Sequence, residues 1–155
     1  MQAEPVLRTV RREDLPAVLT LYADDEFSRG REGGEAAASD PAILQAFADV
    51  EADPNSTLYV LEQDGRIIGT AQLTVIAGLS RGGAKRALVE AVRIASTERN
   101  SGLGRLLMEK LHAVARERGC GLVQLSSDKR RVDAHRFYRA LGYGQSHDGF
   151  KLPLD

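Results

Sequence analysis

Apolar residues alternate with polar ones along several short segments, and this period of two is typical of β-strands. Two such segments, residues 57–63 and 66–77, flank Asp64-Gly65, a dipeptide typical of a tight hairpin turn. These two strands are therefore expected to pair antiparallel. The same pattern predicts further strands at residues 6–10, 87–95 and 122–126.

Apolar residues spaced three and four apart predict helices between these strands. The first two helices are expected to begin at Asp14 and at Asp40, each followed within two residues by a proline that suits a first helical turn. Residues 24–39 between them are predicted to be a polar loop or a broken helix. The strongest amphipathic pattern covers residues 103–118, and a shorter one covers residues 133–141.

The chain is expected to end in a second hairpin, with strands at residues 143–146 and 150–154. The strand, helix and strand between residues 87 and 126 imply one parallel pair, whereas the hairpins imply antiparallel pairs. We therefore predict an α/β (α+β) fold, with a mixed, mostly antiparallel sheet and helices on both of its faces. Residues 1–155 are predicted to form a single domain.

Composition narrows the class of protein. Of the 155 residues, 43% are hydrophobic and 28% are charged, as in ordinary globular proteins. A net charge of −1 argues against a general nucleic-acid binder. The apolar runs are too short to cross a bilayer, and the first ten residues lack a secretory signal, so a cytoplasmic protein is expected. One cysteine allows no internal disulfide, and no Cys/His spacing indicates a metal site.

The junction at residues 99–104, here called the glycine turn, links a predicted strand to the long amphipathic helix. The first N–H groups of a helix have no internal partner and lie at the positive end of its dipole. Glycines let a phosphate approach these groups, and flanking arginines add charge. We therefore predict that this segment binds a pyrophosphate through Arg99, Asn100, Ser101, Gly102, Leu103, Gly104 and Arg105.

Two familiar phosphate-binding motifs do not fit this turn. It has no Gly-Lys-Ser/Thr run of a Walker loop, and Leu107 stands where the dinucleotide fingerprint needs a small residue. The remaining pattern, Arg-x-x-Gly-x-Gly after a strand, resembles the signature of the GNAT superfamily of N-acetyltransferases. Residues 134–143, Ala-His-Arg-Phe-Tyr-Arg-Ala-Leu-Gly-Tyr, are similar to the late helix of that superfamily. The predicted order of helices and strands also matches the superfamily.

The resemblance implies direct transfer of an acetyl group from acetyl-coenzyme A to an amine, without an acyl-enzyme. Cys120, beside two glycines, is accordingly expected to be a packing residue and not a nucleophile. The resemblance also implies a bulge in the strand at residues 87–95, where the backbone of Val92, Arg93 and Ile94 pairs with the pantetheine arm. Because dimers are common in the superfamily, a homodimer is left open.

Two side chains are candidates for proton transfer. The resemblance makes Tyr138 the acid that protonates the leaving thiolate, although its helical spacing also suits a core position. Glu90 shares a strand face with apolar residues, and desolvation there is expected to raise its pKa and suit it as the base. An exposed Glu90, with water as the base, is the alternative.

The start of the late helix leaves two further alternatives open. Asp133 stands where the superfamily often has an asparagine that contacts pantetheine, but it also suits the N-cap of the helix, the interpretation preferred here. The basic run at residues 129–131 suits either the 3′-phosphate of coenzyme A or a solvated surface.

The resemblance places the acceptor pocket between the first two helices and at the final hairpin. An acidic rim there favours a cationic amine, although nearby arginines offset the charge. The residues are Asp24, Asp25, Glu26, Phe27, Arg29, Arg31, Glu32, Glu35, His147 and Asp148. Three rival functions stay open: a non-catalytic acyl-coenzyme A sensor, an acyltransferase with another donor or a hydroxyl acceptor, and a nucleotide-binding domain.

Overall fold

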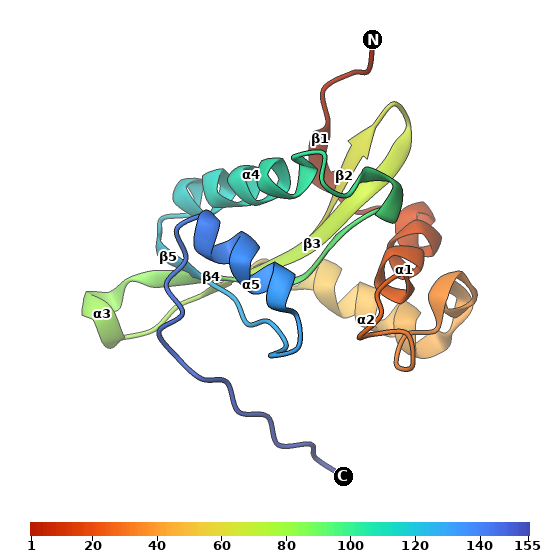
Figure 1. Cartoon of the computed structure of the whole chain (residues 1–155). Coiled ribbons are helices and arrows are strands. Elements are labelled where there is room, and N and C mark those ends of the chain that lie inside the picture. Colours follow the sequence, from red (N-terminus) through yellow and green to blue (C-terminus); the bar gives the residue numbers. More distant parts are fainter. The chain divides into compact units, whose positions relative to one another are not determined.

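Five strands form one mixed sheet in the computed structural model, which describes residues 1–155 (Figure 1). They lie side by side in chain order, the first four antiparallel and the last pair parallel. The strands are β1 (Val6–Thr9), β2 (Ser56–Gln63), β3 (Arg66–Ile76), β4 (Lys85–Ile94) and β5 (Cys120–Gln124). The predicted mixed, mostly antiparallel sheet is confirmed, although β5 begins two residues before the predicted strand.

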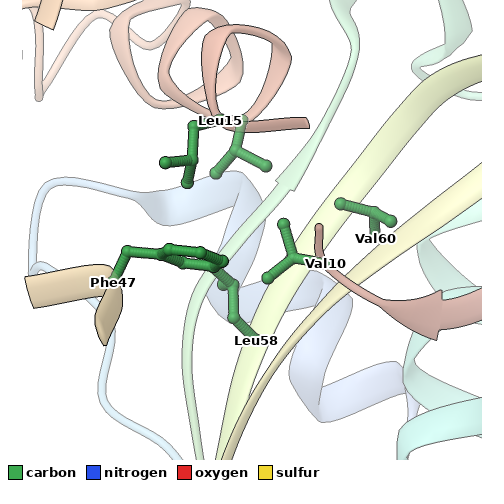
Figure 2. Packing of buried hydrophobic residues seen from close by; sticks show 6 residues of the cluster. Val10, Leu15, Phe47, Leu58 and Val60 are labelled. Atoms are coloured by element: carbon green, nitrogen blue, oxygen red, sulfur yellow. The ribbon is translucent and has the colours of Figure 1, made fainter. Parts of the chain in front are cut away.

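The chain divides into two compact units, residues 1–124 and 125–155, and the whole sheet belongs to the first. In this unit α1 (Leu15–Ala23) and α2 (Pro41–Ala52) cover one face of the sheet. Figure 2 shows how their side chains meet those of the sheet in an apolar cluster. Its buried members are Val10, Leu15, Val18, Phe47, Leu58 and Val60. Asp40 caps α2 as predicted, because its carboxylate accepts the N–H of Ala42 at 2.9 Å.

The opposite face of the sheet packs against α4 (Leu103–Glu117). Neighbouring residues of a strand point to opposite faces, so Leu61 points away from the cluster that contains Val60. Leu73 and Val89 are paired across β3 and β4 on that face, and both are buried. The helix contributes Leu107, Met108 and Leu111, each 0% exposed. The prediction of helices on both faces of the sheet is thereby confirmed.

Four short helical turns complete the first unit: η1 (Arg12–Asp14), η2 (Gly34–Ser39), α3 (Ser80–Gly83) and η3 (Ser96–Glu98). The predicted loop or broken helix between α1 and α2 ends in η2, which matches the second of those alternatives. The segment between β3 and β4 contains the single turn α3. None of the helices is long and apolar enough to pass through a membrane.

The second unit contains one helix, α5 (Val132–Ala140), followed by an extended chain. The predicted final hairpin is wrong, because residues 143–155 form no strand. Phe150, Leu152 and Leu154 do alternate, but all three are strongly exposed. Alternation gives strand propensity only, and a hairpin of such short strands is marginal without a surface to bury. Gly144, inside the first of the two predicted strands, weakens it further.

An ion-pair cluster joins β1, η1 and β2. Arg8 donates to both oxygens of Asp14, at 2.7 and 3.0 Å, and also to the carboxylate of Glu62. The N–H of Arg11 donates to Asp14 at 2.7 Å. The hydrogen bonds from Arg8 are the main reason that the pKa of Asp14 lies below its ordinary value, although burial opposes them.

Removing this carboxylate charge is expected to destabilise the fold at neutral pH. Asp14→Asn should lower the free energy of unfolding by about 2 kcal/mol, because it leaves the guanidinium of Arg8 with the carboxylate of Glu62 as its remaining counter-charge. Since the pKa of Asp14 is lower in the folded state, its contribution is complete above the ordinary value of 3.8 and is lost as the pH falls below it. Urea denaturation at pH 7 and pH 3 measures both effects. Asp49→Asn, on the exposed side of α2, is the control.

Candidate functional site

The glycine turn has the backbone geometry that its sequence predicts. It follows η3 and leads directly into α4, whose N-cap is Gly102. Gly102 adopts a left-handed conformation with φ of 84°, and Asn100 does so with φ of 63°. Glycine and asparagine tolerate this conformation better than other residues. The residue types at these two positions therefore explain why the chain reverses here.

The turn leaves the first N–H groups of α4 pointing out of the helix end. The N–H of Leu106 donates to the carbonyl of Gly102 at 3.1 Å, so the N–H groups of Leu103, Gly104 and Arg105 precede the first bond of the helix. Together with the helix dipole, these three N–H groups give the N-terminus of α4 a partial positive charge that suits an anion.

Two arginines place further positive charge at this turn. Arg99 donates from Nη2 to the carbonyl oxygen of Asp24 at 2.8 Å and lies 3.9 Å from its carboxylate. Arg105 forms an ion pair with Glu109, one helical turn along α4, at 3.5 Å. Both arginine side chains are about half exposed. Ion pairs of such exposed groups are weak, so an anion with higher charge can compete for them.

A bulge interrupts β4 just before the turn. Gln72 pairs with Glu90 and Thr70 pairs with Arg93, so Ala91 and Val92 together face Ala71. Ala91 takes a positive φ of 51°, which marks where the strand bends. The bulge that the resemblance implies is confirmed.

The outer edge of β4 is left without a strand beyond this region. Pairing with β5 ends at Leu88 and Gln124, so Val92, Arg93 and Ile94 have a neighbouring strand only on the β3 side. A strand edge of this kind presents N–H and C=O groups at regular spacing. The edge of this segment therefore suits an extended ligand; pairing with such a ligand, and its identity, stay predictions.

Glu90 occupies the position next to the bulge, but it is exposed. The predicted desolvation of its carboxylate is therefore wrong. Its neighbours Ala87 and Val89 are buried on the α4 face, whereas Glu90 lies on the face of α1, which covers it incompletely. Alternation along a strand identifies the residues that share a face, but it does not say how far a helix covers that face.

Several charged side chains act on Tyr22 of α1, near this part of β4. Burial is the main reason that the pKa of Tyr22 is raised. The positive charge of Arg93 opposes this shift, whereas Glu32 and Glu90 add to it. One arginine and two carboxylates thus act on the same phenol.

A cluster of polar groups ties Arg93 to the loop that follows α1. Nη2 of Arg93 donates to Oγ of Ser28 at 3.2 Å and lies 3.9 Å from the carboxylate of Asp25, while Nη1 donates to the carbonyl of Val92 at 2.9 Å. Ser28 is 0% exposed and also accepts from Arg31 at 3.1 Å. Sequence analysis missed the roles of Ser28 and of the Arg93 side chain, because no pattern distinguishes a buried serine in a polar loop.

In the second unit, Tyr138 lies on the apolar stripe predicted for α5. The four members of that stripe, residues 134, 137, 138 and 141, are half-buried. The Tyr138 ring packs edge-on against Phe137 and Tyr143, with centroids 5.2 and 5.7 Å apart. Desolvation, and then the proximity of Tyr138, raises the pKa of Tyr143 to about 12. The part that Tyr138 plays in catalysis stays a prediction.

Asp133 does not cap α5, so the preferred interpretation is wrong. The helix begins two residues earlier than that interpretation requires, its N-cap is Arg131, and Asp133 in the first turn pairs with Arg136. In the preceding basic run, Arg130 pairs with Asp128 at 2.8 Å, which offsets part of the positive charge. Contacts of Asp133 and of this run with a ligand stay predictions.

The structure was also searched for a metal site and for a surface hollow near the predicted site residues. No group of three or more His, Cys, Asp or Glu side chains is arranged to hold a metal ion. A surface hollow of about 400 Å³ contains none of the predicted site residues. It is lined by Arg12, Glu13, Leu15, Pro16, Ala38 and Leu44.

This chain was compared with protein-family models, with solved structures and with curated proteins, and the first two gave matches. The model of the acetyltransferase (GNAT) family matches residues 15–143 and so extends over both compact units. A transcriptional regulator from Bacillus halodurans C-125 is similar in structure, with 36% identity and a TM-score of 0.92 over 97% of this chain and 100% of that one. A putative acetyltransferase from Agrobacterium tumefaciens str. C58 shares 26% identity, with a TM-score of 0.83 over 96% and 99% of the two chains. No curated protein matches the sequence.

Proposed function

Because the chain belongs to the acetyltransferase (GNAT) family, we propose that it transfers the acetyl group of acetyl-coenzyme A directly to a primary amine of a small molecule or peptide. One observation carries this proposal: the one-sided, bulged end of β4 leads within a few residues into the glycine turn of α4. A thioester carrier has an extended amide arm joined to a diphosphate, and these two features suit its two parts in the same order.

The residues of the first unit fit such a donor. The N–H groups of Leu103, Gly104 and Arg105 would hold the diphosphate, and Arg99 would add charge to it. The backbone of β4 from Val92 to Ile94 would pair with the amide arm as an added strand. Bound acetyl-coenzyme A supplies an acetyl group already activated as a thioester.

Direct transfer requires no nucleophile from the protein. Cys120 supports this, since it pairs with Lys85 at the end of β4 remote from the bulge at Ala91. Tyr138 is proposed to protonate the departing thiolate, and Glu90 or water to accept the proton of the amine. Because Glu90 is exposed, a water molecule can relay a proton to its carboxylate.

The acidic residues of the loop after α1 are only weak evidence for a cationic acceptor, because several of them are paired with arginines. Asp24 is paired with Arg99, Asp25 with Arg93, and Glu32 with Arg31. These arginines offset the charge that would attract a cation, so the proposal is limited to a primary amine. Residues 1–155 are proposed to act as one domain, since the family model extends across both units.

A non-catalytic acyl-coenzyme A sensor is the second candidate. It is favoured by one observation, the 36% identity with a protein described as a transcriptional regulator. Thiol release from acetyl-, propionyl- and succinyl-coenzyme A, measured with a panel of amines, distinguishes the candidates. An N-acetyltransferase releases thiol from the acetyl donor with at least one amine, whereas a sensor binds the donor and releases none.

The glycine turn provides a test of donor binding. Gly102→Val should raise the dissociation constant of coenzyme A about tenfold or more, because a β-branched residue disfavours the left-handed conformation that aims the N–H groups. Calorimetric titration measures it. Gly65→Val is a matched control, since Gly65 has a φ of 78° in the β2–β3 turn and equally open surroundings. Equal affinities of the two variants would contradict the assignment of the diphosphate site.

Tyr138 is tested by removing only its hydroxyl. Tyr138→Phe should lower kcat about 30-fold through loss of the general acid, while coenzyme A affinity stays within about twofold of wild type. Steady-state kinetics and titration calorimetry give the two quantities. Tyr59→Phe, in the middle of β2, serves as the control. An unchanged kcat would remove Tyr138 from the proposed mechanism.

Glu90 is tested through the pH dependence of the rate. If its carboxylate accepts the amine proton, directly or through water, Glu90→Gln should abolish the acidic limb of the kcat/KM profile and lower the maximum about tenfold. Glu51→Gln, on the exposed surface of α2, controls for a general loss of acidic charge. An acidic limb that persists at its wild-type position would leave solvent water alone as the base.

A further inference from the structure

The side chain of Arg93 connects the bulged end of β4 to the loop of residues 24–33, here called the α1 loop. We propose that Arg93 is a positioning residue: it holds the α1 loop against the bulge, and the held loop forms a wall of the site that receives the acceptor amine. The inference rests on the proposed function, because it takes the bulged end of β4 as the place where the amide arm of the donor lies.

Arg93 can act in this way because its backbone and its side chain face different neighbours. Its backbone pairs with Thr70 of β3 on one side and leaves the other strand edge for the donor. Its side chain is only 15% exposed and extends to Ser28 and Asp25 of the α1 loop. One residue thereby links the segment proposed to hold the donor to a loop 65 positions earlier in the chain.

Ser28 is the centre of this contact. Its hydroxyl accepts from Arg93 at 3.2 Å and from Arg31 at 3.1 Å, and donates to Asp25 at 2.7 Å. A hydroxyl has one donor and two acceptor positions, so all three are in use. The residue is fully buried, and within the loop its carbonyl accepts the N–H groups of Arg31 and Glu32. Removing either Arg93 or this hydroxyl would leave buried polar groups without partners.

A second arginine fixes the beginning of the same loop. Arg99, the first residue of the glycine turn, donates to the carbonyl of Asp24, and Arg93 reaches the next residue, Asp25. The α1 loop is therefore attached at both ends of the segment that joins the bulge to the glycine turn. A loop attached at these two points borders the proposed donor site, and so it lies where a second substrate must approach.

This arrangement predicts a difference between the two substrates. The donor would be held mainly by backbone groups, which a change in the Arg93 side chain leaves in place. The acceptor would depend on the conformation of the α1 loop, which that change releases. A planar guanidinium with several donors is needed to reach Ser28, Asp25 and the carbonyl of Val92 together, so lysine can replace it only in part.

The experiment compares wild type with Arg93→Gln, Arg93→Lys and Ser28→Ala. Arg118→Gln is the matched control, because Arg118 ties another turn to a helix end through one bond to the carbonyl of Pro54. Acceptor KM should rise about tenfold in Arg93→Gln and Ser28→Ala and about threefold in Arg93→Lys, with donor KM within about twofold of wild type. The control should match wild type in both constants.

Limited proteolysis gives a readout that does not need catalysis. Arg29 and Arg31 are exposed trypsin sites within the α1 loop. Cleavage after them should be about tenfold faster in Arg93→Gln and Ser28→Ala than in Arg118→Gln, at equal resistance to urea. Mass spectrometry identifies the cleaved bonds, and Ser28→Ala keeps the test available if Arg93→Gln does not fold.

The outcomes separate this inference from the proposed function. If amines are acetylated but acceptor and donor KM rise together, or neither changes, Arg93 does not position the acceptor site and the inference is overturned. If no amine is acetylated, the proposed function fails. Unchanged cleavage of the α1 loop in the variants would overturn the anchoring role of Arg93 in either case.

Discussion

The requirement that backbone N–H and C=O groups find partners determines how this molecule is arranged around β4. Parallel pairing with β5 ends at Leu88, and the bulge at Ala91 turns the rest of the strand. From there to Ile94, β4 has a neighbouring strand on one side only, and the short turn η3 then leads to the glycine turn. Unpaired edges are costly unless water or a ligand satisfies them. The open edge and the cationic end of α4 are therefore consecutive parts of one surface, and the proposed donor follows both.

The two faces of the sheet differ in the residues that they carry near the bulge of β4. The α4 face is fully apolar at Leu73, Val89 and Leu107, which fixes the helix whose first turn forms the candidate anion site. The α1 face near the bulge carries Glu90, which is exposed, and Arg93, which contacts the α1 loop. Val89 thus packs on one side of β4, while the opposite side carries the charged side chains of Glu90 and Arg93, to which the proposed roles are assigned. A strand with alternating side chains allows this division without an additional element.

Local signals explain why much of the fold could be predicted. Asp64-Gly65 specifies a hairpin by itself, and Gly102 is required by the left-handed conformation that begins α4. The exposure of Glu90 depends on how far α1 extends over the sheet, which no local pattern contains. The contact of Arg93 with Ser28 spans 65 positions, and the sequence gives no reason to pair them. The predicted final hairpin rests on strand-like segments on either side of His147-Asp148-Gly149, although a strand also needs a neighbour and a surface to cover.

The outer border of the sheet at β1 limits how copies of this protein can associate. β1 has only four residues, and Pro5 directly before it cannot donate a hydrogen bond. Arg8, near its middle, is committed to Asp14 and Glu62. An incoming strand from another molecule would find few groups to pair with and a fixed charge beside them. Extension of the sheet by edge-to-edge pairing between molecules is thus disfavoured at β1, even in concentrated solution.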